Sequence, residues 1–142
     1  MEEVIVSERL PTVAEYIGLR TTMGWGRIDQ ATSDRTLQAA AFTVCLHRRD
    51  RLAGIARVMG DGALYFFLAD LIIAPEFHGS GYGERLMQAV TSYFDRSALP
   101  GATITLVALN GQEAFYEKFG FMRCPSGPFG TAMHYAAAPP PG

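Results

Sequence analysis

The sequence contains little cysteine, little charge and no long apolar run. Only two of its 142 residues are cysteines, Cys45 and Cys124, and they form no C-x-x-C pair. Their spacing therefore indicates neither a zinc site nor a redox motif. Charged residues make up 18% of the chain, and the formal net charge is −2. A slightly acidic chain has no general affinity for nucleic acid or anionic membranes, so we expect neither as a partner.

No apolar run reaches the ~18–20 residues that a membrane-spanning helix requires. The chain begins with Met1-Glu2-Glu3, whereas a secretory signal begins with positive charge. We therefore expect a cytoplasmic protein with two reduced thiols. At this length, with 49% hydrophobic residues, the chain can bury one core. We predict a single domain over residues 1–135 and a disordered, proline-rich tail over residues 136–142.

A glycine-rich stretch in the middle of the chain carries the strongest signal. The apolar residues 63–73 predict a strand that is covered on both faces, and Pro75 ends it because proline cannot donate a ladder hydrogen bond. Gly79, Gly81 and Gly83 then leave room for backbone N–H groups to face a bound anion, at the positive end of the next helix. The stretch predicts a site for a phosphate-bearing ligand, although a simple glycine-rich turn could carry the same residues.

Two other phosphate-binding loops do not match this stretch. A Walker loop ends in Gly-Lys-Ser/Thr, and no lysine follows these glycines. A dinucleotide-binding loop has the spacing G-x-G-x-x-G early in a βαβ unit. Here the spacing is G-x-G-x-G, and the preceding strand lies in the middle of the chain.

The remaining elements are predicted from hydrophobic periodicity and turn residues. Residues 63–73 and 103–108 should form a parallel pair with a right-handed crossover. We expect strands at residues 4–6, 42–47, 52–59, 63–73 and 103–108, a further strand beginning at residues 121–122, and a last strand at residues 131–135. We expect helices at residues 12–22, from Asp29 or Ser33 to Ala40, from Tyr82 to just before Leu99, and at residues 112–119.

The residues His78-Gly79-Ser80-Gly81-Tyr82-Gly83 resemble the Gln/Arg-x-x-Gly-x-Gly/Ala pyrophosphate loop of the GNAT superfamily of N-acetyltransferases. The resemblance includes residues 70–77, resumes at Asn110 and residues 114–121, and covers residues 42–135. His78 stands where the superfamily usually has Gln or Arg. Because such a loop binds mainly through backbone N–H groups, we expect this substitution to be tolerated.

The resemblance implies a fold of the α/β (α+β) class. Its centre would be a mixed, mostly antiparallel sheet with a splayed parallel strand pair, flanked by helices on both faces. Acetyl-CoA would bind as a substrate, with the backbone of Leu71 and Ile73 on its pantetheine arm and with Ile72, at a bulge, beside the acetyl carbonyl. The diphosphate would lie on the loop, and no metal is implied. The loop residues are His78, Gly79, Ser80, Gly81, Tyr82 and Gly83; further contacts would come from Asn110, Ala114, Tyr116 and Lys118.

The resemblance also assigns Tyr116 as the catalytic acid. A phenol with an ordinary pKa of ~10 suits protonation of a departing thiolate, but Tyr116 could also be a core aromatic residue. The general base stays open between Asp70, which would precede the bulge, Glu117 and water, and either carboxylate could be structural instead. A covalent route through Cys45 would need an activating base, and the sequence places no histidine next to it.

These features predict direct transfer of an acetyl group from acetyl-CoA to the primary amine of a small molecule, in a ternary complex. The acceptor pocket would be formed by the first two helices, Trp25 and residues 123–130, a segment similar to that of small bacterial acetyltransferases of unassigned substrate. Two alternatives are a peptide or protein N-acetyltransferase and a non-catalytic acyl-CoA-binding or sensory module, because fold does not fix function. A homodimer through the C-terminal strands, with Phe121, Met133 and Tyr135, is also expected.

Overall fold

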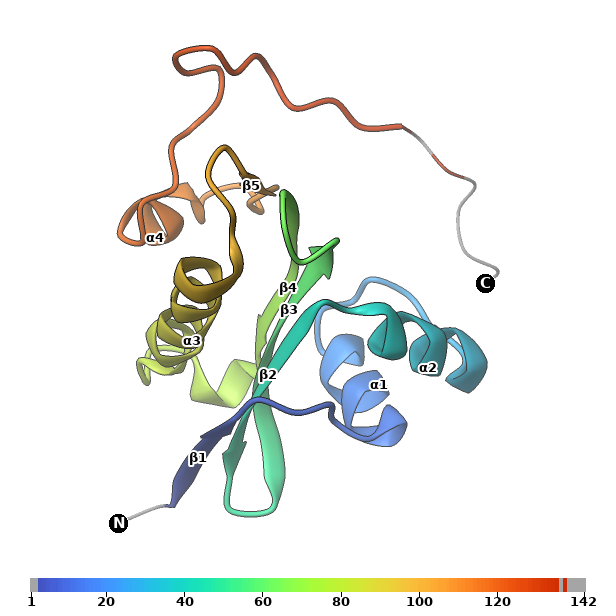
Figure 1. The fold of residues 1–142 in the computed structure, drawn as a ribbon. Helices are drawn as coiled ribbons and strands as arrows, with labels where there is room; N and C mark the ends of the chain where they lie inside the picture. The colour runs from blue at the N-terminus through green and yellow to red at the C-terminus, as the bar shows by residue number, and fades with distance from the viewer. Residues whose placement is uncertain (1–2, 136, 138–142) are drawn as a thin grey trace.

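A computed structural model describes residues 3–135 and residue 137. Its centre is a five-stranded sheet in the order β1-β2-β3-β4-β5. The first four strands are antiparallel neighbours, and β4 and β5 are parallel (Figure 1). This arrangement confirms the predicted mixed sheet with one parallel pair. The strands are β1 Val4–Ser7, β2 Phe42–Arg48, β3 Arg51–Gly60, β4 Tyr65–Ile73 and β5 Thr103–Leu106.

Helices cover both faces of the sheet, as predicted. The helices α1 (Val13–Thr21) and α2 (Gln30–Ala39) lie on one face, and α3 (Tyr82–Ser97) lies on the other (Figure 1). Thr12 and Glu15 form a capping box that starts α1. Asp29 starts α2 by accepting a hydrogen bond of 2.7 Å from the Thr32 backbone N–H.

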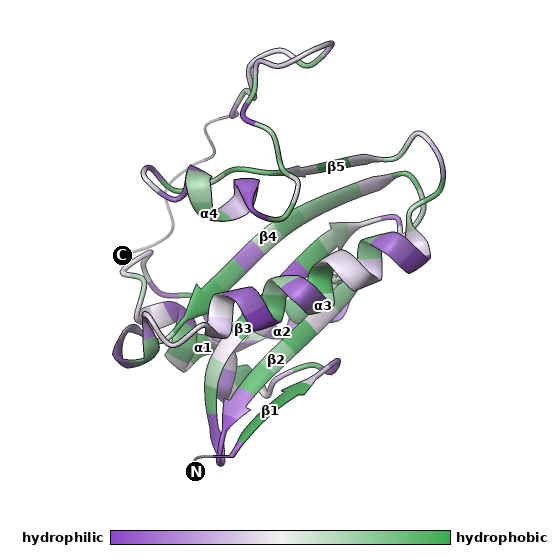
Figure 2. Cartoon of the chain, turned by 90° about the vertical axis from the view of Figure 1, so that its left-hand side faces the viewer, coloured by the Kyte–Doolittle hydropathy of each residue, from purple (hydrophilic) through white to green (hydrophobic). Residues whose placement is uncertain are grey.

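The sheet therefore has a hydrophobic core on each face, and its central strands are mostly apolar (Figure 2). The stripe predicted for α3 is buried against one face through Leu86, Val90 and Phe94. On the other face, Tyr16 and Leu37 of α1 and α2 pack against the strands. The alternation predicted for β2 is confirmed, since Phe42, Val44 and Leu46 belong to the first core and Cys45 to the second.

A β-bulge interrupts β4 at Ala69. Asp70 pairs with Arg57 of β3 and Leu68 pairs with Val58, so Ala69 has no partner in this ladder. Leu68 faces the α3 core, whereas Ile72 belongs to the α1–α2 core. The predicted position of the bulge, at Ile72, is wrong because Ile72 pairs regularly with Ile55, and Asp70 follows the bulge. Because β4 is covered on both faces, polar and apolar residues do not alternate along it. The sequence therefore gives no signal for the position of the bulge.

Strand β5 is only four residues long and ends earlier than the predicted residue 108. It pairs with β4 from Tyr65–Thr103 to Leu68–Leu106. This pairing stops immediately before the bulge, so residues 69–73 of β4 have a strand neighbour only on the β3 side. This open stretch is the splayed region that the sequence predicted.

The helix predicted at residues 112–119 is shorter, α4 (Glu113–Glu117). The two strands predicted after it are wrong: residues 121–135, here called the C-terminal arm, form only an isolated bridge between Ser126 and Phe129. Proline cannot donate to a ladder, and Pro125 and Pro128 interrupt the arm. The arm arches away from α4 (Figure 1). The predicted disorder of residues 136–142 concerns positions that, apart from residue 137, lie outside the described residues.

Candidate functional site

The glycine loop lies between β4 and α3, after a short 3₁₀ turn, η1 (Pro75–Phe77). Gly79 and Gly81 have φ angles of 84° and 81°, which side chains rarely allow. Gly81 is the N-cap residue of α3, and no side chain caps this helix. The first N–H groups of a helix have no intrahelical acceptor, and here they lie at the positive end of the helix dipole. Such a loop has the geometry that binds anions at other helix starts.

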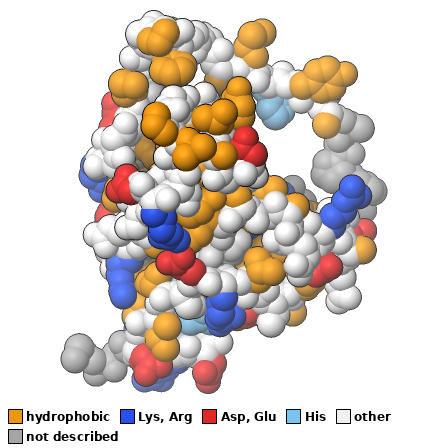
Figure 3. Space-filling model, in the orientation of Figure 1, with side chains coloured by type: hydrophobic (Ala, Val, Ile, Leu, Met, Phe, Trp, Pro, Cys, Tyr) orange, Lys and Arg blue, Asp and Glu red, His pale blue; other side chains and the backbone are white. Residues whose placement is uncertain are grey.

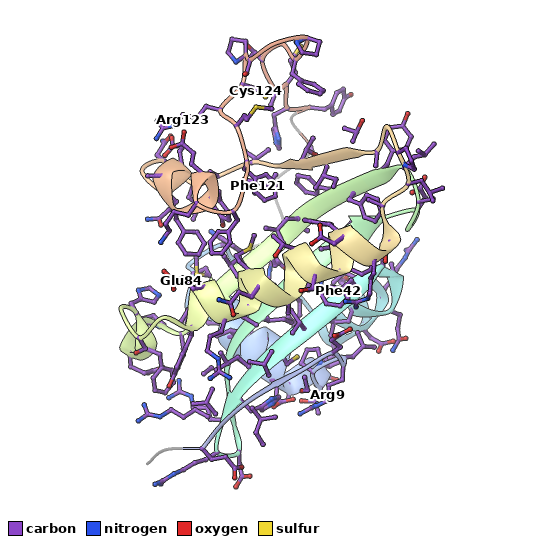
Figure 4. All side chains as sticks on the ribbon, turned by 60° about the vertical axis from the view of Figure 1, so that its left-hand side comes forward. Arg9, Phe42, Glu84, Phe121, Arg123 and Cys124 are labelled. Carbon is purple, nitrogen blue, oxygen red and sulfur yellow. The ribbon has the colours of Figure 1, made fainter. Side chains whose placement is uncertain are left out.

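Two charged residues lie beside this loop. Lys118 of α4 donates a hydrogen bond of 3.2 Å to the Glu84 carboxylate, which lies at the start of α3 (Figure 4). The pKa of Glu84 is lowered, first by a hydrogen bond from its own backbone N–H and then by Lys118. Lys118, predicted to reach a phosphate, is thus held next to the loop by an ion pair. Gly83 also leaves room for the Phe115 ring of α4 at the start of α3, because a Cβ there would lie 3.2 Å from that ring.

The open edge of β4 presents backbone groups from two predicted residues. The Ala74 N–H donates to the Ala53 carbonyl of β3 at 2.8 Å. Since antiparallel residues alternate in direction, the backbone groups of Leu71 and Ile73 point away from β3, toward the open edge. Polar backbone groups in such a position need a partner.

His78 reaches this open edge with its side chain. Its Nε2 donates a hydrogen bond of 2.8 Å to the Ile73 carbonyl. The imidazole therefore connects the loop to the open edge of β4, and it does so without occupying the N–H groups of Leu71 and Ile73.

Tyr116 lies half-buried on α4, between the rings of Phe115 and Phe121. It packs against the same core as the side chains of Leu71 and Ile73. Burial raises the pKa of Tyr116 above 10.0, so the phenol is protonated at neutral pH. Within the described residues its hydroxyl makes no hydrogen bond. Tyr116 is therefore a protonated phenol on the α3 side of the sheet.

Two other predicted residues lie near α4 but make no recorded side-chain contact. Asn110 is exposed in the turn that follows β5, and Ala114 is exposed in the first turn of α4. The structure thus places them at the same end of the sheet as Tyr116, on elements that follow one another in the chain.

Asp70 belongs to a buried polar cluster on the α1–α2 face. Its Oδ2 accepts hydrogen bonds from Arg57 Nη1 at 2.6 Å and from the Tyr16 hydroxyl at 2.7 Å. Arg57 and Asp70 are only 3% and 5% exposed. Arg57 Nη2 also donates to the carbonyl and hydroxyl oxygens of Thr36 on α2, at 2.8 and 2.9 Å. Asp70 is therefore a structural acceptor that ties both helices to the sheet.

The sequence analysis did not identify Arg57 or Tyr16 as members of this cluster. A signal was present, because Arg57 is an unpaired charge inside the otherwise apolar residues 52–59, and arginine is seldom buried without a partner. The partner could not be inferred, since Asp70 and Tyr16 come from other elements.

The remaining candidates for proton transfer or nucleophilic attack are engaged or inert. Glu117 accepts a hydrogen bond of 2.9 Å from Arg123. Burial raises the pKa of Cys45 to about 12, and its Sγ donates to the Arg9 carbonyl. His47, on the same strand, is bonded instead to Glu15 at 2.8 Å. A thiol of such a pKa is protonated at neutral pH, so the geometry does not support a covalent route through Cys45.

In the part of the chain that the structure describes, no three His, Cys, Asp or Glu residues are grouped so that they could hold a metal ion. Within the same residues, no helix is both long and apolar enough to cross a membrane.

Comparison with known proteins agrees with this geometry. Residues 20–131 match the family model of the acetyltransferase (GNAT) domain. An uncharacterized N-acetyltransferase of Porphyra purpurea, ycf52, is 34% identical over 110 residues, which are 75% of this chain and 62% of that protein. The chain therefore spans about three fifths of the length of this curated relative.

Solved structures show the same fold. A Staphylococcus aureus protein of unknown function, SA2161, described as a probable acetyltransferase, superposes with a TM-score of 0.82 at 30% identity, covering 94% of this chain and all of that one. A GNAT-family acetyltransferase of Streptococcus pneumoniae gives 0.80 at 20% identity, with 95% and 98% covered. The chain belongs to the GNAT acetyltransferase family.

The Arg57–Asp70 pair leads to a prediction about stability. Replacing Asp70 by Asn keeps the size of the side chain but leaves the buried Arg57 guanidinium without its charge partner. We expect Asp70→Asn to lower the free energy of unfolding by about 3–5 kcal/mol, measured by urea denaturation. Asp95→Asn on the exposed side of α3 is the matched control. A loss no larger than that of the control would contradict a structural role for Asp70.

Proposed function

We propose that the protein is an acetyl-CoA-dependent N-acetyltransferase that acts on the primary amine of a small molecule. The observation that carries the proposal is the open edge of β4, which leads directly to the uncapped start of α3. An extended, amide-containing arm with a diphosphate at one end is complementary to these two features. A structural neighbour of 16% identity, the aminoglycoside N-acetyltransferase AAC(6')-Iy, was solved with a bisubstrate analogue of CoA and acetylneamine.

Different residues of the site bind the diphosphate and the pantetheine arm of acetyl-CoA. The backbone N–H groups of the loop and of the first turn of α3 bind the diphosphate, and those of Leu71 and Ile73 bind the pantetheine arm. Lys118, Asn110 and Ala114 lie at the same end of the sheet and complete the donor side. The loop residues are His78, Gly79, Ser80, Gly81, Tyr82 and Gly83. The buried side chain of Ile72 belongs to the opposite face. Its backbone groups face Ile55 of β3, so neither its side chain nor its backbone reaches the open edge.

The reaction is direct transfer within a ternary complex. The bound donor supplies an acetyl thioester. The amine nitrogen forms a bond to the acetyl carbon as the carbon–sulfur bond breaks, and Tyr116 gives its hydroxyl proton to the departing sulfur. The raised pKa of Tyr116 keeps this proton in place at neutral pH. Because Asp70 and Glu117 are both engaged in ion pairs, the amine proton passes to water, and water returns a proton to the Tyr116 phenolate.

The acceptor side lies on the opposite face of the sheet from α3. A hollow of about 290 Å³ there is lined mainly by apolar side chains, among them Met59, Tyr65 and Phe67. Trp25, 38% exposed, follows α1 near this face. A hollow of this size suits a small molecule with an apolar body.

The function can be tested by measuring release of the CoA thiol with a panel of small primary amines. We expect at least one amine to be acetylated. Binding of acetyl-CoA without transfer to any amine would favour the non-catalytic acyl-CoA-binding module. Transfer to peptide N-termini alone would favour the peptide N-acetyltransferase.

Gly81 provides a test of donor binding. A side chain at this position would stand where the anion approaches the backbone, so Gly81→Leu should weaken acetyl-CoA binding by roughly tenfold or more, measured by calorimetry. Gly101→Leu is the matched control, because Gly101 has a similar φ of 85° and equally open surroundings but lies after α3. Equal affinities of the two variants would show that the loop does not hold the donor.

Tyr116 provides a test of the chemical step. Tyr116→Phe keeps the ring and its packing, so donor affinity should be nearly unchanged while the turnover number falls by about 10²–10⁴-fold. The protonated phenol is the active form. The wild-type rate should therefore hold below the pKa of Tyr116 and fall as the pH rises through it, above pH 10.0. If the variant keeps full turnover and the same alkaline decline, Tyr116 is only a core residue.

We also propose a homodimer that forms through the C-terminal arm, in a cytoplasmic location that suits two free thiols. Met133 and Tyr135 are 95% and 92% exposed, and hydrophobic side chains gather along the arm (Figure 3). Phe121, by contrast, packs on the core at the base of the arm (Figure 4).

Light scattering at micromolar concentration should give the mass of a dimer. Replacing Met133 and Tyr135 together by Asp should give a monomer, because the charges oppose burial of the arm. A monomeric wild type would contradict the proposal.

A further inference from the structure

The buried cluster around Asp70 contains more positive than negative charge. Arg57 Nη1 lies 2.6 Å from Asp70 Oδ2, and Arg20 Nη1 lies 3.9 Å from Asp70 Oδ1. Among the described residues, Asp70 is the only acidic group within ion-pair distance of either guanidinium. The short contact pairs Asp70 with Arg57, so the charge of Arg20 is the one left without close compensation.

Arg20 also has hydrogen-bonding capacity that the protein does not use. Its Nε is shielded from solvent and has no hydrogen-bond partner. The side chain as a whole is 25% exposed and lines a small depression of the surface, so a ligand can approach it from outside. Its carbon Cζ lies 5.1 Å from the centre of the Trp25 ring, which fixes its orientation but adds no negative charge. A partly exposed guanidinium whose nearest carboxylate lies 3.9 Å away can bind a further anion.

Arg20 is connected to the acceptor face of the sheet. Its cluster partner Arg57 has Nη2 at 3.5 Å from the sulfur of Met59, and Met59 lines the apolar hollow. On its other side, Arg20 lines a small depression with Gly26 and Ile28, in the connection between α1 and α2. The charge of Arg20 thus belongs to the same face of the sheet as the hollow assigned to the acceptor.

We propose that the acceptor is an amine that also carries a carboxylate, and that Arg20 binds this carboxylate. The proposal rests on the acetyltransferase function proposed above and names its substrate class. The planar guanidinium of arginine matches a carboxylate in a bidentate arrangement. The apolar body of the acceptor would lie in the hollow lined by Met59, Tyr65 and Phe67, which describes an amino acid with a hydrophobic side chain.

The first test measures binding of the carboxylate without any reaction. Trp25 is the only tryptophan in the chain and contacts Arg20, so its fluorescence should report a ligand at this site. We expect 3-phenylpropionate to change this fluorescence in a saturable manner and the neutral 3-phenylpropionamide to bind more weakly. Arg20→Gln should weaken binding of 3-phenylpropionate by about 10–100-fold, whereas Arg20→Lys, which keeps the charge, should restore part of it.

Arg35→Gln is the matched control, because it removes the same charge from an exposed position on α2. The melting temperature of each variant would verify that it is folded. Two results would overturn the proposal: equal binding of the acid and the amide by the wild type, or equal loss of binding in Arg20→Gln and Arg35→Gln. Stronger binding of phenyl phosphate than of 3-phenylpropionate would also overturn it, since the site would then select phosphate.

The second test uses transfer itself, with L-phenylalanine and phenethylamine, which differ only in the carboxylate. Arg20→Gln should lower kcat/KM for phenylalanine about tenfold more than for phenethylamine, with the KM for acetyl-CoA unchanged. An equal loss with both amines would contradict carboxylate recognition by Arg20. If neither amine is acetylated while 3-phenylpropionate still binds through Arg20, the transfer function fails but the carboxylate site stands.

Discussion

The extra residue Ala69 in strand β4 is the constraint on which the rest of the site depends. Up to Leu68 the strand has neighbours on both sides, and beyond it only β3 remains. The bulge also reverses which side chains face each core, so that Asp70 and Ile72 turn toward α1 and α2. The backbone of Leu71 and Ile73 is left at an open edge. One inserted residue therefore produces both a strand edge without a neighbouring strand, where a donor could bind, and a buried carboxylate.

Burying the Asp70 carboxylate costs free energy, and the hydrogen-bond partners around it offset this cost. A charge removed from water is expensive unless it is paired and hydrogen-bonded, and Asp70 has both Arg57 and the Tyr16 hydroxyl as partners. Burial and the nearby Asp70 raise the pKa of Tyr16, which keeps this phenol a donor. Because Arg57 also bonds Thr36, the same cluster fixes α1 and α2 against the strand that carries the open edge. The walls of the acceptor side are therefore positioned relative to the donor strand by polar contacts as well as by apolar packing.

Local signals predicted much of this fold. The starts of α1 and α2, the strand β2 and the glycine loop depend on residues that are close in the chain, and each was placed to within a few residues. The position of the bulge, the partner of Arg57 and the conformation of the arm depend on residues far apart. Residues 131–135 have an apolar pattern, but a strand also needs a free ladder beside it, which the sequence does not reveal.

The two substrates of the proposed reaction would meet at one strand from different sides. The donor would lie along the open edge of β4, with its diphosphate at the start of α3, while the acceptor would approach the face that Arg57 and Asp70 share with the hollow. The side chain of Tyr116 comes from α4, beyond β5, and reaches the core on the α3 side. The strand itself separates this proton donor from the Arg20 cation on the other side. The sulfur would thus be protonated on the donor side, while the charge of the acceptor is bound on the far side of the sheet, where it cannot compete for the loop that holds the diphosphate.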